Sequence, residues 1–265
     1  MSSTRARHGN GGPPVPQPDG MLPTMKRCFL AFAALLFLDL PVAGQSQMKE
    51  WLNSGTEKDR VQKLVSLGVE RETAELAGGE EVEWRPIRSE SHREVAILFL
   101  PCGALYAAFL HLLEKTDQGW RVTDSVGFDC HYDESVSFET APLRSPNFDD
   151  VLVHHECEEH GTGFVQQNLN VFAIVSSRFK LILTTEEIIE QMDTSGEFLQ
   201  RSSFAQIPAT EPISRGLAET RCVTLSGKRT VYRRQFRWSA ARFRFLRSQF
   251  IKVQAGEEKS KAACR

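Results

Sequence analysis

The sequence predicts a mainly β protein: an antiparallel β meander, sandwich or propeller-like, with a short helical N-terminal cap. Two observations carry this prediction. Residues 80–253 form short runs rich in β-branched and aromatic residues, and turns such as Asp117-Gln118-Gly119 separate the runs. Residues 45–79 instead show the capping residues and apolar spacing of short helices. The 265 residues are 41% hydrophobic and 25% charged, which is the composition of ordinary globular proteins.

The helical cap is predicted from its start and stop signals. Thr56 has the position of an N-cap, Asp59 follows three residues later, and Gly68 supplies the stop. The apolar residues between them fall near one helical face: Val61, Leu64, Val65 and Leu67. A second short helix is predicted over residues 71–77, before Gly78-Gly79. We expect this helical pair to cover part of the β domain that follows.

The β domain is predicted from runs that lie between turn residues. These runs are residues 82–87, 95–100, 120–126, 150–157, 169–175 and 179–184. Residues 104–115 have a helical composition, but their place between two predicted strands favours a strand, with a helix as the alternative. Residues 186–192 are predicted as a helical turn. Residues 202–215 are predicted as a loop because they contain Pro208 and Pro212.

The clearest hairpin of the chain lies near its C-terminal end. Its first arm, residues 230–238, alternates aromatic residues with cations and other residues. Tyr232, Phe236 and Trp238 share one face, and Arg229, Val231, Arg233 and Arg237 share the other. After Ser239-Ala240-Ala241 the alternation resumes, with Phe243 and Phe245 set against Arg242 and Arg244. We therefore expect one apolar face that packs and one cationic face that meets water.

Residues 25–44 have the pattern of a secretory signal peptide. Two cations precede a short apolar run, residues 28–40, and small residues follow a helix breaker. Cleavage is predicted before Gln45, which places the mature protein in the periplasm or outside the cell. The run is shorter than a bilayer span and contains Asp39, so no membrane span is expected after cleavage, and a retained anchor is the alternative. Residues 1–24 are predicted to be disordered or to precede a true start at Met21 or Met25.

Cleavage would leave five cysteines: Cys102, Cys130, Cys157, Cys222 and Cys264. An oxidising compartment permits disulfides, and the odd count leaves at least one thiol free or intermolecular. We predict the pairs Cys130 with Cys157 and Cys222 with Cys264. The alternative is that some cysteines are small buried hydrophobic residues. The tail, residues 254–265, is polar and is predicted to be flexible.

The densest group of potential metal ligands is His154-His155-Glu156-Cys157-Glu158-Glu159-His160. It is not a zincin helix, because the second histidine of that motif would stand one residue too far along. In a strand, His154, Glu156, Glu158 and His160 would share one side and could take zinc with help from another strand. This predicts, as one alternative, a metal-binding protein or metal-dependent hydrolase. The other interpretation is the polar end of a strand.

Other catalytic patterns are missing from the sequence. Gly161-Thr162-Gly163 lacks the further residues of a phosphate loop or a dinucleotide site. There is no Gly-x-Ser-x-Gly elbow and no papain-like cysteine neighbourhood. The carboxylates Asp124, Asp129, Asp133 and Glu134 are disfavoured as a glycosidase pair because exposed turns commonly carry such residues. The sequence therefore predicts no catalytic residue and no cofactor other than the zinc of that alternative.

Charge is unevenly distributed along a chain of net charge −2. Residues 129–160 contain nine acids and one base, whereas residues 215–252 contain eleven bases and one acid. The favoured function is a non-catalytic structural or interaction module that binds through Arg233, Arg237, Arg242 and Arg244. Its expected partner is an anionic envelope component, an acidic protein or the chain's own acidic block. Nucleic acid is disfavoured because the protein is exported and its hairpin aromatics face away from most of the arginines.

Overall fold

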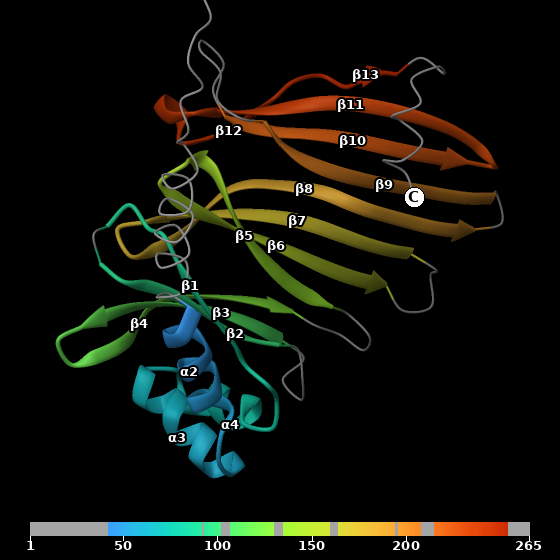
Figure 1. The fold of residues 1–265 in the computed structure, drawn as a ribbon. Coiled ribbons are helices and arrows are strands. Elements are labelled where there is room, and N and C mark those ends of the chain that lie inside the picture. The colour runs from blue at the N-terminus through green and yellow to red at the C-terminus, as the bar shows by residue number, and fades with distance from the viewer. Residues whose placement is uncertain are drawn as a thin grey trace, which may run out of the picture. The chain divides into compact units, whose positions relative to one another are not determined.

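A computed structural model describes residues 42–91, 93–101, 107–129, 135–159, 164–193, 196–207 and 215–253. Within these residues, three α-helices precede thirteen β-strands, which confirms the predicted β class with a helical cap (Figure 1). Apart from the first three residues of α2, these elements belong to one compact unit, Gln45–Arg265. Among the described residues, no helix combines the length and the apolar character that crossing a bilayer requires.

The helices are α2 (Val42–Asn53), α3 (Glu57–Leu67) and α4 (Arg71–Ala77). α3 starts in the predicted way, because the Thr56 hydroxyl accepts from the backbone N–H of Asp59 and the Asp59 carboxylate accepts from the backbone N–H of Thr56. It ends at Gly68, whose φ of 98° suits glycine. The predicted second helix is confirmed as α4. α2 was not predicted, and it begins three residues before the expected cleavage site.

The first sheet contains β1 (Glu83–Ile87), β2 (Val95–Leu100), β3 (Ala107–Thr116) and β4 (Gly119–Asp129), paired in that order and all antiparallel. β3 confirms a strand rather than a helix at residues 107–116. All six residues of β2 are buried, because both faces of this sheet are covered. The uninterrupted apolar sequence of β2 is suited to that position.

The second sheet has nine described strands, eight of which form a continuous antiparallel meander. Its strands are β5 (Val136–Ser145), β6 (Phe148–Glu159), β7 (Phe164–Val175), β8 (Arg178–Asp193), β9 (Gly196–Ile207), β10 (Gly216–Leu225), β11 (Lys228–Ser239), β12 (Arg244–Arg247) and β13 (Ile251–Lys252). Strands β5 to β12 pair in sequence order, and β13 pairs with β11. The sheet stays open, with β5 and β12 as the two ends of that order.

Two predictions in this sheet were wrong. Residues 186–192 are not a helical turn but the second half of β8, where Ile188 pairs with Arg201 and Met192 pairs with Glu197. Residues 202–207 are not a loop but the end of β9, paired with β10. In both segments, hydrogen bonds to neighbouring strands outweigh a weak local preference for a helical turn or a loop. The strands β5 and β10 were not predicted.

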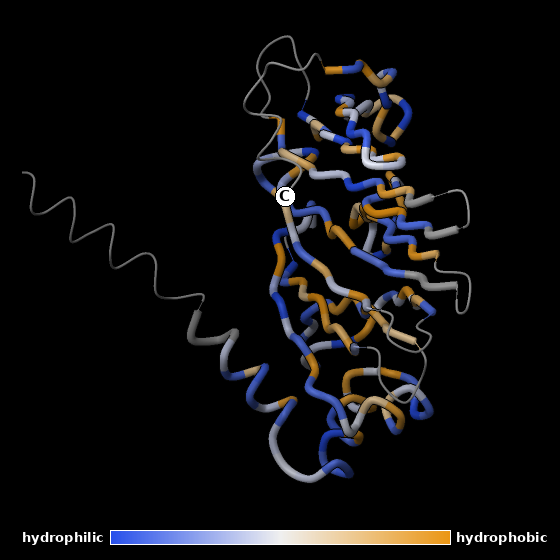
Figure 2. Tube along the Cα trace, turned by 90° about the vertical axis from the view of Figure 1, so that its right-hand side faces the viewer, coloured by the Kyte–Doolittle hydropathy of each residue, from blue (hydrophilic) through white to orange (hydrophobic). Residues whose placement is uncertain are grey.

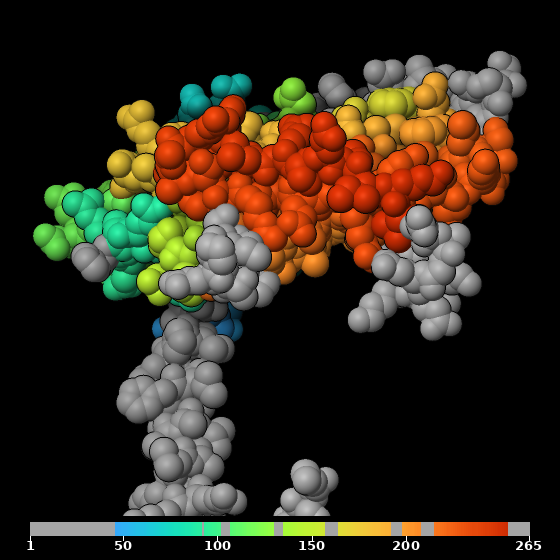
Figure 3. Space-filling view, turned by 90° about the horizontal axis from the view of Figure 1, so that it is seen from above, coloured from blue at the N-terminus to red at the C-terminus, as the bar shows by residue number. Residues whose placement is uncertain are grey.

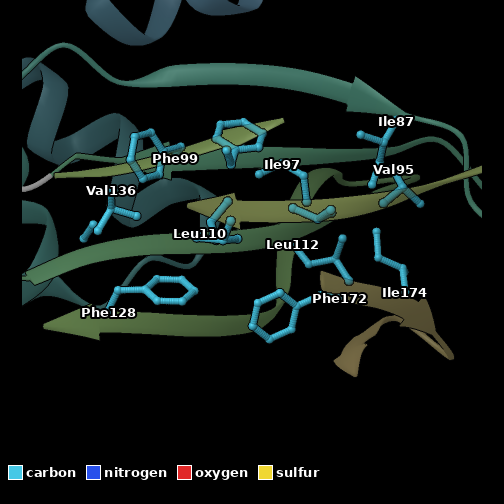
Figure 4. Close-up of a cluster of buried hydrophobic side chains, with 14 residues drawn as sticks. Ile87, Val95, Ile97, Phe99, Leu110, Leu112, Phe128, Val136, Phe172 and Ile174 are labelled. Carbon is cyan, nitrogen blue, oxygen red and sulfur yellow. The ribbon is translucent and has the colours of Figure 1, made fainter. Parts of the chain in front are cut away.

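The two sheets pack face to face, which corresponds to the sandwich alternative. Figure 4 shows Ile97, Phe99 and Leu110 of the first sheet pointing into a cluster that also holds Val136 and Phe172 of the second sheet. On its other face, the first sheet packs against the helices. That layer contains Leu52, Leu64, Leu67, Trp84, Leu98 and Leu113. The cap and the two sheets thus form three layers.

The nine-stranded sheet has a second apolar face, which we call the inner face because strands from both ends of the sheet share it. Its cluster includes Leu143 of β5, Leu217 of β10 and Phe236 of β11. Arg215, next to β10, donates from Nη1 to the backbone oxygen of Pro142 at 3.0 Å. The sheet therefore bends until its two ends share a core. Figure 2 shows hydrophobic and hydrophilic residues alternating along these strands, as this arrangement requires.

Candidate functional site

The C-terminal hairpin forms as the residue alternation predicts. β11 and β12 pair with Trp238 opposite Phe245 and Ser239 opposite Arg244. The two strands are joined by a short 3₁₀ turn, Ala240–Arg242, so Arg242 lies in the turn and not in a strand. Phe236 and Phe245 are buried in the inner-face core. The aromatic side of the hairpin therefore packs, as expected.

Arginines on the opposite side of this hairpin form what we call the outer arginine face. Arg229, Arg233 and Arg237 recur at every fourth residue on one side of β11, and Arg244 is paired with Ser239 on the same side of the sheet. Arg233 and Arg237 are half-buried, whereas Arg242 and Arg244 are exposed. In Figure 3, residues of the C-terminal strands, coloured orange to red, form a broad surface. All four arginines predicted to bind therefore lie on this side or at the adjoining turn.

The outer arginine face receives no carboxylate from its own strands. Glu219 is the single acidic residue within β10, β11 and β12. It stands opposite Arg234 and belongs to the inner side of the sheet. Two cations of the basic block, Arg221 and Arg234, face Glu219 from that same side. The charge of the basic block is thus divided between two surfaces.

On the inner side, Glu219 is fully buried between Arg221 and Arg234. Nε of Arg234 donates to Oε2 of Glu219 at 2.5 Å, and Nε of Arg221 donates to Oε1 at 2.8 Å. The Ser202 hydroxyl donates to Oε1 at 2.9 Å. Both oxygens of the carboxylate are therefore occupied, and one acid orients two arginines.

The rest of each guanidinium is directed by further contacts. Nη2 of Arg234 donates to the Thr185 hydroxyl at 2.8 Å. Nη1 of Arg221 donates to Oε1 of Gln200 at 3.2 Å and lies 3.4 Å from Oε2 of Glu186. The Phe250 ring covers both cations, with its centroid 4.2 Å from Cζ of Arg234 and 4.6 Å from Cζ of Arg221. These contacts hold both arginines in defined positions.

A polar cavity of about 490 Å³ opens over these arginines. Three arginines line it: Arg221, Arg234 and Arg247. Neutral hydrogen-bonding residues of β7 and β8 form another part of its wall: Gln166, Asn168, Thr184 and Thr185. Among the described residues of the lining, Glu186 is the one carboxylate. We call this space the arginine cavity.

The electrostatics of the arginine cavity are those of crowded positive charge. Burial lowers the pKa of Arg234 below its ordinary value, although its bond to Glu219 opposes that shift. The neighbouring charges of Arg221 and Arg247 lower the same pKa further. Among the described residues, Glu186 and Glu219 offset two of the three cations, which leaves an excess of about one positive charge.

Three of the four predicted metal ligands, His154, Glu156 and Glu158, lie in β6. His154 Nδ1 lies 2.6 Å from Oε2 of Glu187, and Glu156 accepts from the Ser135 hydroxyl at 2.7 Å. His160 and the side chain of Glu158 lie outside the described residues. In the described part of the chain, no group of three histidine, cysteine or acidic side chains has an arrangement that could hold a metal ion. The zinc site stays a prediction.

The contact between His154 and Glu187 changes the properties of the histidine. Its bond to Glu187 raises the pKa of His154, burial opposes the shift, and Glu139, 3.9 Å from Nε2, adds to it. This pair is a polar continuation of the inner face beyond Leu152 and Leu169. The contact with Glu187, which was not predicted, therefore accounts for the position of His154 in β6.

Several other predicted features lie outside the described residues. Cys130 and Cys264 lie there, so each predicted disulfide pair has one member outside the described residues, and Cys222 is buried in β10. Asp133 and Glu134 also lie outside the described residues, whereas the Asp124 carboxylate accepts from the backbone N–H of Phe179 at 2.7 Å. Asp124 therefore has a structural role at the junction of β4 and β8.

Sequence reasoning missed the arginine cavity, although one signal was present. Arg234 has the same alternation phase as Tyr232 and Phe236, which places a cation on the face that packs. A buried cation needs a partner, and Glu219 is the one acid in the basic block. That pair was thus accessible from the sequence. The contributions of β7 and β8 were not, because they depend on how the sheet bends.

Comparison of this chain with protein-family models, curated proteins and solved structures found no match in any of the three.

Proposed function

We propose that this chain is an exported, non-catalytic interaction module, and that its outer arginine face binds an anionic component of the cell envelope. The observation that carries the proposal is the composition of that face. Four arginines lie on one side of β11 and β12, Arg242 adjoins them, and the single acid of these strands and β10 lies on the other side. Such a surface attracts anions at long range and binds them by hydrogen bonds at contact.

The spacing of these arginines supports a repetitive partner. Arg229, Arg233 and Arg237 follow one another at every fourth residue of a single strand. A strand rises about 3.3 Å per residue, so successive side chains stand about 13 Å apart. A rigid row of this kind suits phosphates or carboxylates that recur along a polymer or across a lipid surface. Arginine also binds both groups through two parallel hydrogen bonds.

Binding of the full chain to anionic probes tests the proposal. Vesicles containing phosphatidylglycerol and immobilised polygalacturonate supply recurring phosphate and carboxylate groups, and phosphatidylcholine vesicles and dextran are the neutral controls. We expect binding to at least one anionic probe, with affinity that falls as salt rises. Replacing Arg233, Arg237, Arg242 and Arg244 by serine should weaken that binding by about tenfold or more.

A charge-matched variant distinguishes the effect of this surface on binding from the effect of overall net charge. Lys58, Arg71, Lys115 and Arg178 are exposed cations outside the C-terminal strands, and their replacement by serine removes the same amount of charge. This control variant should bind like the wild type. Equal weakening in both variants would contradict the proposal, as would wild-type protein that binds neither anionic probe. Retention by an acidic protein alone would favour the second predicted partner.

Export is the part of the proposal that rests on residues 25–44. Expression of the full chain in a Gram-negative host tests it, followed by N-terminal sequencing of protein from the periplasm and the medium. We expect a chain that begins at Gln45. Protein that stays in the cytosol with residues 25–44 attached would count against export, and the binding experiment would be unaffected.

A further inference from the structure

The arginine cavity is a second surface, separate from the outer arginine face in position and chemistry. Its cations belong to the inner side of the sheet, where Arg221 and Arg234 flank Glu219. Arg242 and Arg244 of the outer arginine face are exposed, whereas Arg234 is only 8% exposed and is held by three neighbours, Glu219, Thr185 and Phe250. The arginine cavity is therefore pre-organised.

We propose that the arginine cavity binds a small hydroxylated oxyanion, a sugar acid or a sugar phosphate. Its three arginines would hold the carboxylate or phosphate group, and Gln166, Asn168 and Thr184 would hydrogen-bond the hydroxyl groups. A volume of about 490 Å³ is within the usual range for small-molecule sites. Both candidates combine an anionic oxygen group with several hydroxyl groups, so the structure assigns this shared chemical class.

The donor count of the arginines supports an oxyanion. A guanidinium carries five N–H groups. Within the described part of the chain, Arg234 uses one on Glu219 and one on Thr185, and the Arg247 guanidinium forms no hydrogen bond. Several donors of these arginines are thus available to one ligand. Glu219 takes the Nε–H of Arg221 and of Arg234, and Gln200 and Glu186 contact Nη1 of Arg221, so the available donors are the remaining Nη groups of these cations.

An unpartnered polar atom next to the cavity wall agrees with this assignment. Gln200 is only 5% exposed, and its Oε1 accepts from Arg221. Its Nε2 has no hydrogen-bond partner among the described residues. A buried amide nitrogen without a partner is costly, and an acceptor on a bound ligand or a water molecule would satisfy it.

The neutral residues of the wall distinguish this site from a simple ion site. Nε2 of Gln166 donates to Oδ1 of Asn168 at 2.9 Å, and the Thr184 hydroxyl donates to Oδ1 of Asn170 at 2.9 Å. These bonds orient the amide and hydroxyl groups of β7 and β8. Oriented amides and hydroxyls opposite fixed cations match a ligand with an anionic end and a hydroxylated body.

Isothermal titration calorimetry on the full chain tests the proposal with three probes: D-glucuronate, glucose 6-phosphate and neutral glucose. We expect one-to-one binding of at least one of the two anions and no binding of glucose. Binding of one anion alone would identify whether carboxylate or phosphate is preferred. Two wild-type results would overturn the proposal: failure of both anions to bind, or equal binding of glucose.

Variants locate the binding at the cavity. Arg247→Gln removes an exposed cation that forms no hydrogen bond in the described part of the chain, so the fold should survive. Asn168→Asp places a carboxylate in the wall at nearly constant shape. Each variant should weaken anion binding by about tenfold or more. Arg247→Gln removes a charge-assisted hydrogen bond to the anion, and Asn168→Asp adds a repulsive negative charge. Arg178→Gln, a change of the same charge elsewhere, should leave binding intact.

The proposals for the outer arginine face and for the arginine cavity can be contradicted independently of each other. The variant with serine at Arg233, Arg237, Arg242 and Arg244 keeps every cavity residue and should retain the small anion. Undiminished binding in both cavity variants would overturn the assignment of this site, whatever happens on the outer face. Thermal unfolding of each variant confirms that it is folded.

Discussion

The Glu219 carboxylate on β10 accepts a hydrogen bond from Nε of Arg234, the residue directly opposite on β11, at 2.5 Å. The Glu219 side chain is fully buried and the Arg234 side chain is 7% exposed. A buried charge is tolerated only when it is paired, and this carboxylate also serves Arg221. The two arginines of the inner side, Arg221 and Arg234, therefore depend on one acid as their shared charge partner.

Removal of that acid should destabilise the fold. Glu219→Gln leaves two arginines without their shared partner, and loss of one member of a buried ion pair costs about 3 to 5 kcal/mol. We expect a loss of that order in the free energy of unfolding, measured by urea denaturation at pH 7. Glu190→Gln is the matched control, because Glu190 pairs with Arg201 at an exposed position and should cost less than about 1 kcal/mol. Equal losses would contradict the interpretation.

A second prediction concerns His111 on β3. Burial lowers its pKa to about 4, its Nδ1 lies 2.7 Å from the Ser125 hydroxyl, and its Nε2 has no partner among the described residues. The unfolded chain binds the proton more tightly, so stability falls as pH drops from about 6.5 towards 4. This residue alone should remove about 2 kcal/mol of unfolding free energy between pH 7 and pH 5.

The variant His111→Asn isolates this contribution. Asparagine keeps a polar atom near Nδ1 but does not titrate. Urea denaturation of wild type and variant at pH 7 and pH 5 gives the difference directly, and the variant should lose about 2 kcal/mol less on acidification. Parallel pH profiles for the two proteins would show that His111 is not the responsible group.

The pair of His154 and Glu187 should give a pH dependence of the opposite sign. The bond to Glu187 raises the pKa of His154 in the folded state. Its stabilising contribution is therefore fully present below about pH 6.5, the ordinary value, and is lost as pH rises through the raised pKa. NMR titration of the His154 ring should show a lower pKa in Glu187→Gln. Glu139→Gln should shift it less, because Glu139 is exposed and lies 3.9 Å away. A larger shift in the Glu139 variant would reject this account.

The turn between β7 and β8 offers a test of backbone strain. Ser176 and Ser177 have φ values of 50° and 61°, in the left-handed region that favours glycine. Ser176→Gly should raise the free energy of unfolding by up to about 1 kcal/mol, because the side chain at this exposed position resists the conformation. The measurement is urea denaturation.

Ser177→Gly should behave differently at the neighbouring position. The Ser177 hydroxyl donates to the buried carboxylate of Glu114 on β3, which Arg93 also contacts at 2.9 Å. Loss of this bond leaves a buried acceptor less well satisfied and should outweigh the relief of strain, giving a net loss of about 1 kcal/mol. A gain in stability at both positions would mean that the bond to Glu114 contributes little.

Local signals predicted the elements whose structure depends on local interactions. The capping residues Thr56, Asp59 and Gly68 act within a few residues, so α3 forms as expected. The alternation around Phe236 determines which side of β11 packs, because the period of a strand is two wherever the strand lies. The hairpin and its two faces were predicted for that reason.

Local sequence signals did not predict the strands whose conformation depends on pairing with another strand. Residues 186–192 have a helix-like composition, yet they form β8 because β7 and β9 flank them. β5 carries no strong local pattern, and it is a strand because it pairs with β6 and closes the shared inner core. The preference of a strand depends on its neighbours more than on its own residues.

The sequence by itself determined the β class, the helical cap, the hairpin and the division of its arginines between two faces, since these follow from short-range periodicity and capping. Only the tertiary structure decided that Arg221, Arg234 and Arg247 meet Gln166 and Asn168 around one cavity. The physical reason is the bend of the nine-stranded sheet, which brings β7 and β8 towards β10–β12 around a shared core. No local pattern in the chain specifies that curvature.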